Sequence, residues 1–114
     1  MAEHKEHVLV ITIVQRGWGE KVVESACKAG AEGATVAFGR GMGVHEHQKI
    51  LGIAIEPEKE LVLTVVPREK ADKVIDTISA EAELDKPGRG LAFILPIEKV
   101  VGIAHSQHLR KKCP

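Results

Sequence analysis

The run Lys86-Pro87-Gly88-Arg89-Gly90 contains the residue types that best suit the binding of an anion. Glycines on both sides of Arg89 allow consecutive backbone N–H groups to turn inward as an anion-binding nest. Lys86 and Arg89 place positive charge beside that nest. The alternative is an ordinary helix-to-strand turn, because Pro-Gly is also a common turn pair. Taken alone, the run favours the ordinary turn.

A second glycine-rich run, Gly39-x-Gly41-x-Gly43, has the spacing that opens a dinucleotide-binding fingerprint. Val44 stands where a third spaced glycine is needed, and no apolar helix follows. The run therefore favours a flexible loop over a Rossmann-type site.

Histidines in the same loop raise the possibility of metal binding. In His45-Glu46-His47 the two imidazoles share one side if the segment is extended. Two ligands do not complete the coordination of a metal ion, although symmetric subunits could supply more ligands. His105 and His108 would likewise meet on a helical turn. The alternative is chance, since six histidines in 114 residues will include some close pairs.

Other features limit the class of protein. No Ser–His–Asp or acid–base constellation is present, so we predict that the chain is not an enzyme. Sixteen basic residues balance sixteen acidic ones, which argues against general nucleic-acid binding. The longest apolar stretches are strand-sized, too short to be inserted in a membrane. Residues 1–7 are polar, unlike a signal peptide, and two cysteines give no disulfide framework. These observations favour the cytoplasm.

An internal repeat predicts the elements that position these segments. Residues 9–14 recur in pattern at 61–66, fifty-two positions later, and residues 21–25 recur at 73–77. Apolar runs predict strands, and apolar positions at helical spacing predict helices. The expected strands cover 8–14, 34–38, 61–66, 91–97 and a short last strand at 100–104; the expected helices cover 18–28 and 67–82.

Two strand–helix–strand units fold most simply as a ferredoxin-like α+β domain, an antiparallel sheet with both helices on one face. We expect one such domain over residues 1–114, with an excursion at 39–58 that forms an extended loop or β-arm and a polar tail at 105–114. The strands are apolar on both sides, so the open face is expected to pack on other subunits.

The architecture and loops together resemble the nitrogen-regulatory PII signalling family, and more closely its divergent PII-like branch. The resemblance covers Val8 to about Ala104. It is carried by Gly33-Ala34-Thr35-Val36, by Phe38-Gly39-Arg40 and by Lys86 to Phe93, which looks like the family's B-loop. Residues 39–58 resemble a shortened T-loop, and residues 100–108 lie where the C-loop would be.

The resemblance implies a homotrimer with a nucleotide in the clefts between subunits. Thr35 and the backbone near Leu63 would hold the adenine. Backbone amides of the B-loop would hold phosphates. The implied nucleotide-binding set is Thr35, Gly39, Arg40, Leu63, Lys86, Gly88, Arg89 and Gly90. The implied partner-binding loop is Gly41, Met42, Gly43, Val44, His45, Glu46 and His47.

The chain departs from the family pattern at three cations. A lysine after the B-loop glycine and two arginines in the last strand are replaced here by Leu91, Gly102 and Ala104. Losing three charge-assisted contacts of roughly 1.5–3 kcal/mol each weakens the binding of a triphosphate. The effector is therefore expected to be AMP or ADP in preference to ATP, unless Arg40, Arg89 or the C-terminal basic cluster compensates. No redox cofactor is implied.

The long loop also lacks a site for covalent modification. The chain has no tyrosine, and no serine or threonine lies between Val36 and Leu63. A signal must therefore pass through ligand binding and a shift between loop states.

The leading hypothesis is a PII-like sensor of adenine nucleotides whose loop regulates a membrane transporter or a metabolic enzyme. The alternative is a trimer resembling the divalent-cation tolerance proteins, with His45 and His47 as metal ligands.

Overall fold

The computed structural model describes residues 6–43, 48–50, 53–55 and 57–102. Its main sheet has four antiparallel strands in the order β2-β5-β1-β6, and a separate two-stranded sheet pairs β3 with β4. The strands are β1 (His7–Gln15), β2 (Thr35–Arg40), β3 (Gln48–Ile50), β4 (Ile53–Ile55), β5 (Glu58–Pro67) and β6 (Gly90–Pro96), and the helices are α1 (Gly19–Lys28) and α2 (Arg68–Glu81).

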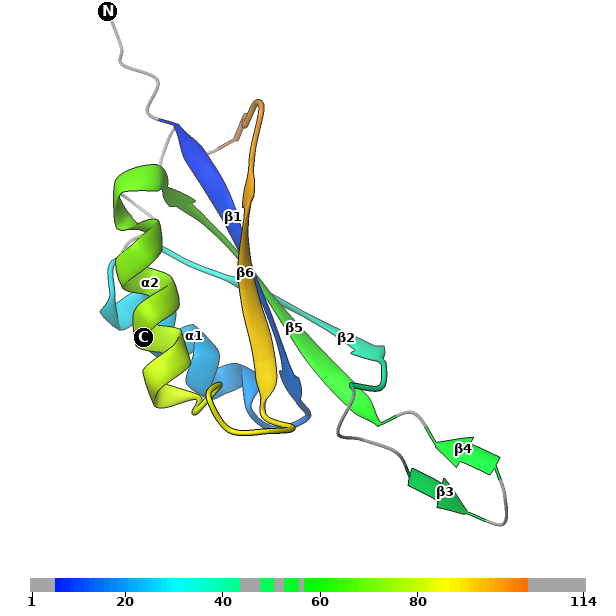
Figure 1. Ribbon diagram of the computed structural model, residues 1–114. Helices are drawn as coiled ribbons and strands as arrows, with labels where there is room; N and C mark the ends of the chain where they lie inside the picture. The colour runs from blue at the N-terminus through cyan, green and yellow to red at the C-terminus, as the bar shows by residue number, and fades with distance from the viewer. Residues whose placement is uncertain (1–5, 44–47, 51–52, 56, 103–114) are drawn as a thin grey trace, which may run out of the picture.

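The internal repeat corresponds to two structural halves. β1, α1 and β2 form the first half, and β5, α2 and β6 form the second. The equivalent strands β1 and β5 pair along their length, from His7 opposite Pro67 to Gln15 opposite Lys59. Both helices lie on the same face of the sheet (Figure 1). The predicted ferredoxin-like α+β fold is confirmed.

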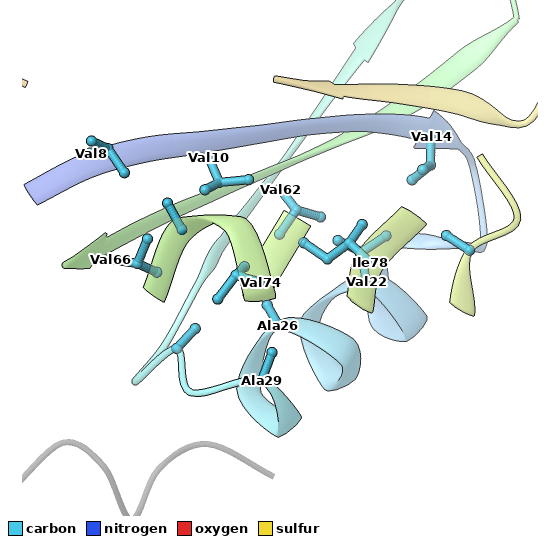
Figure 2. Packing of buried hydrophobic residues seen from close by; sticks show 13 residues of the cluster. Val8, Val10, Val14, Val22, Ala26, Ala29, Val62, Val66, Val74 and Ile78 are labelled. Atoms are coloured by element: carbon cyan, nitrogen blue, oxygen red, sulfur yellow. The ribbon is translucent and has the colours of Figure 1, made fainter. Parts of the chain in front are cut away.

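The core lies between the sheet and the two helices and is aliphatic. Burial alternates along β1, so every second side chain lies beneath the helices. Figure 2 shows these strand residues facing the apolar sides of both helices. The fully buried apolar side chains are Val8, Val10, Val14, Val22, Ala26, Val62, Val66, Val74, Ile78 and Ala82.

Polar contacts join the two helices at one end. Glu81 of α2 accepts a hydrogen bond from the Ser25 hydroxyl at 2.7 Å and pairs with Lys28 of α1 at 2.6 Å. The hydrogen bonds from Lys28 and then Ser25 lower the pKa of Glu81. The carboxylate is therefore ionised at neutral pH and links α1 to α2.

The opposite face of the sheet is apolar and carries no described helix. Strand register places its side chains in three rows across the sheet. The rows are Ile11, Leu63 and Phe93; Ile13, Leu61 and Leu91; and Leu9, Val65 and Leu95. Leu91 is 53% exposed, which leaves a large apolar surface facing solvent in the single chain.

The excursion between β2 and β5 contains strands β3 and β4, which pair with each other in a separate two-stranded sheet (Figure 1). The short last strand expected at 100–104 is wrong for residues 100–102, which form no strand, and Val101 is 81% exposed. An extended segment becomes a strand only when a neighbour pairs its backbone, and no described strand does so. Residues 103–104 and the polar tail lie outside the described residues.

Two further observations concern the cysteines and the length of the helices. Cys27 on α1 is disulfide-bonded, and the sequence did not predict this single bond. Cys113, the other cysteine of the chain, lies outside the described residues. Within the described part of the chain, no helix has the length and apolar character needed to cross a membrane.

Candidate functional site

Most of the candidate residues gather at one end of the sheet. Because β1 and β2 run opposite to β5 and β6, the last residues of the first pair lie beside the first residues of the second. Gly39 therefore lies opposite Lys59, and Val14 lies opposite Gly90. The Lys86–Gly90 turn and the start of the long loop both leave the sheet at this end.

The Lys86–Gly90 run forms a tight turn. The Arg89 N–H donates to the Lys86 carbonyl at 3.3 Å, and Gly88 has a φ of 79°. Proline followed by a glycine with positive φ is the signature of a type II turn. The Arg89 amide therefore donates within the turn in this structure, while the family resemblance implies a phosphate contact for it. A Cβ on Gly90 would lie 2.3 Å from the Ile13 carbonyl oxygen, so this position requires glycine.

Contacts with the β1–α1 connection hold this turn in place. The Gln15 side-chain amide donates to the Gly88 carbonyl at 2.7 Å. The Arg89 guanidinium lies 5.0 Å from the centre of the Trp18 ring, within the range of a cation–π contact. The sequence analysis did not identify Gln15 or Trp18 as part of the site.

The two cations of the turn share one carboxylate. Oε1 of Glu83 lies 3.1 Å from Lys86 Nζ and 3.5 Å from Arg89 Nη2. The hydrogen bond from Lys86 is the main reason that the pKa of Glu83 lies below its ordinary value. Sequence analysis missed this residue, although the i, i+3 spacing from Glu83 to Lys86 could have indicated it.

A groove of about 560 Å³ lies at the end of β2 and contains two of the predicted residues, Gly39 and Arg40. Arg16, Phe38 and Glu58 complete its lining. Arg16 forms an ion pair with Glu58, while the Phe38 side chain is exposed. The groove therefore combines an aromatic surface with two guanidinium groups, one of which is already paired.

The third predicted group consists of Thr35 and Leu63, which are register partners on neighbouring strands. The three groups do not meet in one chain. β6 is separated from β2 by three strand spacings, or about 14 Å. Within one chain the structure therefore keeps the Lys86–Gly90 turn apart from the groove at Gly39 and Arg40.

The start of the predicted partner-binding loop is partly described. The Gly41 N–H donates to the Pro57 carbonyl at 3.2 Å, which joins the two ends of the excursion. Met42 and Gly43 are exposed. Val44, His45, Glu46 and His47 lie outside the described residues. Among the residues that are described, no group of three or more His, Cys, Asp or Glu side chains could hold a metal ion.

Comparison with known proteins identifies the family. The model of the family described as "Nitrogen regulatory protein P-II" matches residues 7–107. The chain belongs to the P-II family. A P-II relative from Methanosarcina barkeri, described as "Nitrogen fixation nifHD1 region GlnB-like protein 1", is 34% identical over 100 residues. That match covers 83% of this chain and 91% of the relative.

Solved structures share the P-II fold at lower identity. The GlnK–ATP complex of B. subtilis superposes with a TM-score of 0.68 at 22% identity, covering 90% of this chain and 91% of that one. A Bacillus cereus protein related to NIF3 superposes with a TM-score of 0.64 at 19% identity. That match covers 86% of this chain but only 27% of the other, so this chain spans about a quarter of that protein.

Membership of the P-II family also fixes the broad class of activity. P-II proteins are signalling proteins that regulate other proteins, and they are not enzymes. The chain is therefore a regulatory protein of ferredoxin-like fold.

Proposed function

We propose that this P-II protein is a cytoplasmic homotrimer that senses AMP or ADP, in preference to ATP, in the clefts between its subunits. The whole chain acts as one domain. Binding of the nucleotide changes the long loop and thereby its contact with a transporter or metabolic enzyme.

The open face of the sheet supports the assembly. Its three rows of apolar side chains come from β1, β5 and β6 and have no helix above them in the described chain. A surface of this size and character is typical of a contact between proteins. A second and third copy of the chain would remove it from water.

The distribution of the candidate residues supports a site between subunits. Thr35 and Leu63 lie on the open face, Gly39 and Arg40 lie in the groove, and the Lys86–Gly90 turn lies at the far edge. In one chain these groups lie at separate places on the sheet rather than around one pocket. Two neighbouring chains could each contribute part of the set.

Positions at which the resemblance implies a cation, but this chain has none, support a ligand with few phosphates. Leu91 follows the turn with an exposed apolar side chain, and Gly102 has no side chain to carry charge. Lys86 and Arg89 are the basic groups of the turn itself, and both contact Glu83. Fewer free cations favour a less highly charged ligand.

Titration calorimetry of the purified full chain with AMP, ADP and ATP tests the proposal. We expect binding of AMP and ADP at micromolar concentrations and weaker binding of ATP. An Arg40→Ala variant should bind several-fold more weakly, because one phosphate contact of roughly 1.5–3 kcal/mol is lost. No heat from any of the three nucleotides at high micromolar concentration would overturn the proposal.

Arg68→Ala is the matched control for Arg40→Ala. Arg68 is also exposed and pairs with Glu6, but it lies at the opposite end of the sheet, where β5 ends. Its loss should leave nucleotide affinity unchanged. An equal loss of affinity in both variants would point to a general effect of charge.

A further inference from the structure

Glu83 has an unusual backbone conformation. It follows the C-cap residue Ala82 of α2 and has a φ of 58°, the only positive φ of a non-glycine residue in the described chain. The Leu84 N–H donates to the Ser79 carbonyl at 3.0 Å, which is the hydrogen bond of a Schellman-type helix end. Glycine is the usual residue at this position because a Cβ is disfavoured there. A side chain kept at a strained position indicates that the side chain has a role.

The carboxylate of Glu83 faces the two cations of the turn. A single oxygen, Oε1, contacts both Lys86 Nζ and Arg89 Nη2. The Arg89 guanidinium also lies 5.0 Å from the centre of the Trp18 ring. The turn is thus already built, and Glu83 occupies the place of an anionic ligand on both of its cations.

The acidic and basic side chains around the turn also balance in number. From Glu83 to Gly90 the chain carries two acidic and two basic side chains, so the net charge of the segment is zero. The hydrogen bond from Lys86 lowers the pKa of Glu83, which keeps its carboxylate ionised at neutral pH. A phosphate that approaches the turn therefore meets neutralised cations and a nearby negative charge.

We infer that Glu83 is a specificity-determining residue that competes with ligand phosphates for Lys86 and Arg89 and so selects against highly phosphorylated ligands. This inference rests on the proposed nucleotide function. A ligand with one phosphate can use one cation while Glu83 keeps the other. A triphosphate brings more negative charge against the Glu83 carboxylate and must displace it from both cations.

The test compares Glu83→Gln with Asp85→Asn in the full chain. Both variants remove one negative charge from the same segment, but Asp85 is exposed and no ion pair of its side chain is seen within the described residues. Calorimetry is performed with AMP, with ATP and with inorganic tripolyphosphate. Tripolyphosphate probes the phosphate contacts without the base.

For Glu83→Gln we expect ATP and tripolyphosphate to bind about threefold to fivefold more tightly, the range that an exposed ion pair contributes. AMP should gain less than about twofold, and Asp85→Asn should change each affinity by less than about twofold. Glu83→Asn is a second variant without the charge, and asparagine tolerates the left-handed conformation well. It should reproduce the change in the ratio of ATP to AMP affinity, and circular dichroism confirms that each variant is folded.

The outcomes separate the inference from the proposed function. Equal changes in Glu83→Gln and Asp85→Asn, or an equal gain for AMP and ATP, overturn the role of Glu83 while the nucleotide function stands. If the native chain binds no nucleotide, the proposed function fails. The tripolyphosphate measurement then decides the role of Glu83, because a gain confined to the Glu83 variants supports it and no such gain overturns it.

Discussion

At the scale of single residues, one carboxylate completes the start of α1. The helix has no side-chain N-cap of its own, because Trp18 occupies that position. Glu60 of β5 instead accepts hydrogen bonds from the N–H groups of Gly17 at 3.1 Å and Gly19 at 2.7 Å. A negative charge at a helix N-terminus also interacts favourably with the helix dipole. Glu60 therefore joins the helix to the central sheet beside the candidate site.

Replacing this carboxylate should destabilise the fold. We expect Glu60→Ala to lower the free energy of unfolding by about 1 kcal/mol, the usual effect of losing an N-cap. Urea unfolding followed by circular dichroism measures the change. Glu24→Ala on the exposed side of α1 is the control and should change stability by less than about 0.5 kcal/mol. Equal effects of the two substitutions would show that Glu60 does not cap the helix.

The sequence predicted some site residues and missed others for identifiable reasons. Pro87 and Gly88 have intrinsic conformational preferences, so the turn they form was foreseeable. The spacing of Glu83 and Lys86 could indicate their ion pair, but the left-handed backbone of Glu83 and its contact with Arg89 were not foreseeable. The contacts of Gln15 and Trp18 with the turn join residues distant in sequence, and residue spacing along the chain does not report such contacts.

At the scale of elements, each of the two central strands contains a buried threonine hydroxyl. The hydroxyl oxygens of Thr12 on β1 and Thr64 on β5 are buried, and neither has a hydrogen-bond partner among the residues that the structure describes. Both side chains occupy the helix-covered face, where their neighbours are valines. An unsatisfied buried hydroxyl reduces stability because its hydration is lost without replacement.

Replacing one hydroxyl by a methyl group should therefore stabilise the protein. We expect Thr64→Val to raise the free energy of unfolding by about 1 kcal/mol, since the shape is kept and an unpaired polar group is removed. Thermal and urea unfolding measure this. Thr77→Val on α2 is the control, because Thr77 is more accessible and its hydroxyl donates to the Lys73 carbonyl. A loss of stability in Thr64→Val would mean that the hydroxyl has a partner, such as a buried water.

The local pattern of apolar residues in the sequence predicted the principal helices and strands well. The alternation along β1 and the apolar stripes of the helices arise from positions close together in sequence, so they were readable without the fold. The expected strand at 100–104 was the exception over its described part. An apolar run does not reveal which strand edge will pair with it, and no described strand offers such an edge to residues 100–102.

At the scale of the whole molecule, the open apolar face of the sheet is the contact that we propose between chains. Leu91 is the most exposed side chain of the three apolar rows. We expect Leu91→Lys to shift the protein from trimer toward monomer, because a charge there would be buried without a partner at the contact. Native mass spectrometry or sedimentation velocity reports the assembly.

Leu91→Met is the matched control for this change and should leave the trimer intact, since size and apolar character are kept. A Leu91→Lys protein that remains trimeric would place the subunit contact elsewhere.

The fold of one chain was predictable from its sequence. The proposed nucleotide site was not, because its candidate residues lie at separate places on the sheet of one chain.

The paired ends of the β2–β5 excursion have a consequence for how such proteins diversify. Arg40 lies opposite Glu58 in the ladder, and the Gly41 N–H bonds to the Pro57 carbonyl, so the sheet itself closes the excursion. Once the ends of a loop are held together, doubling its length costs only about 0.6 kcal/mol in closure entropy. The arm can therefore gain, lose or exchange residues over evolutionary time while the body stays unchanged, which allows one scaffold to acquire new partners.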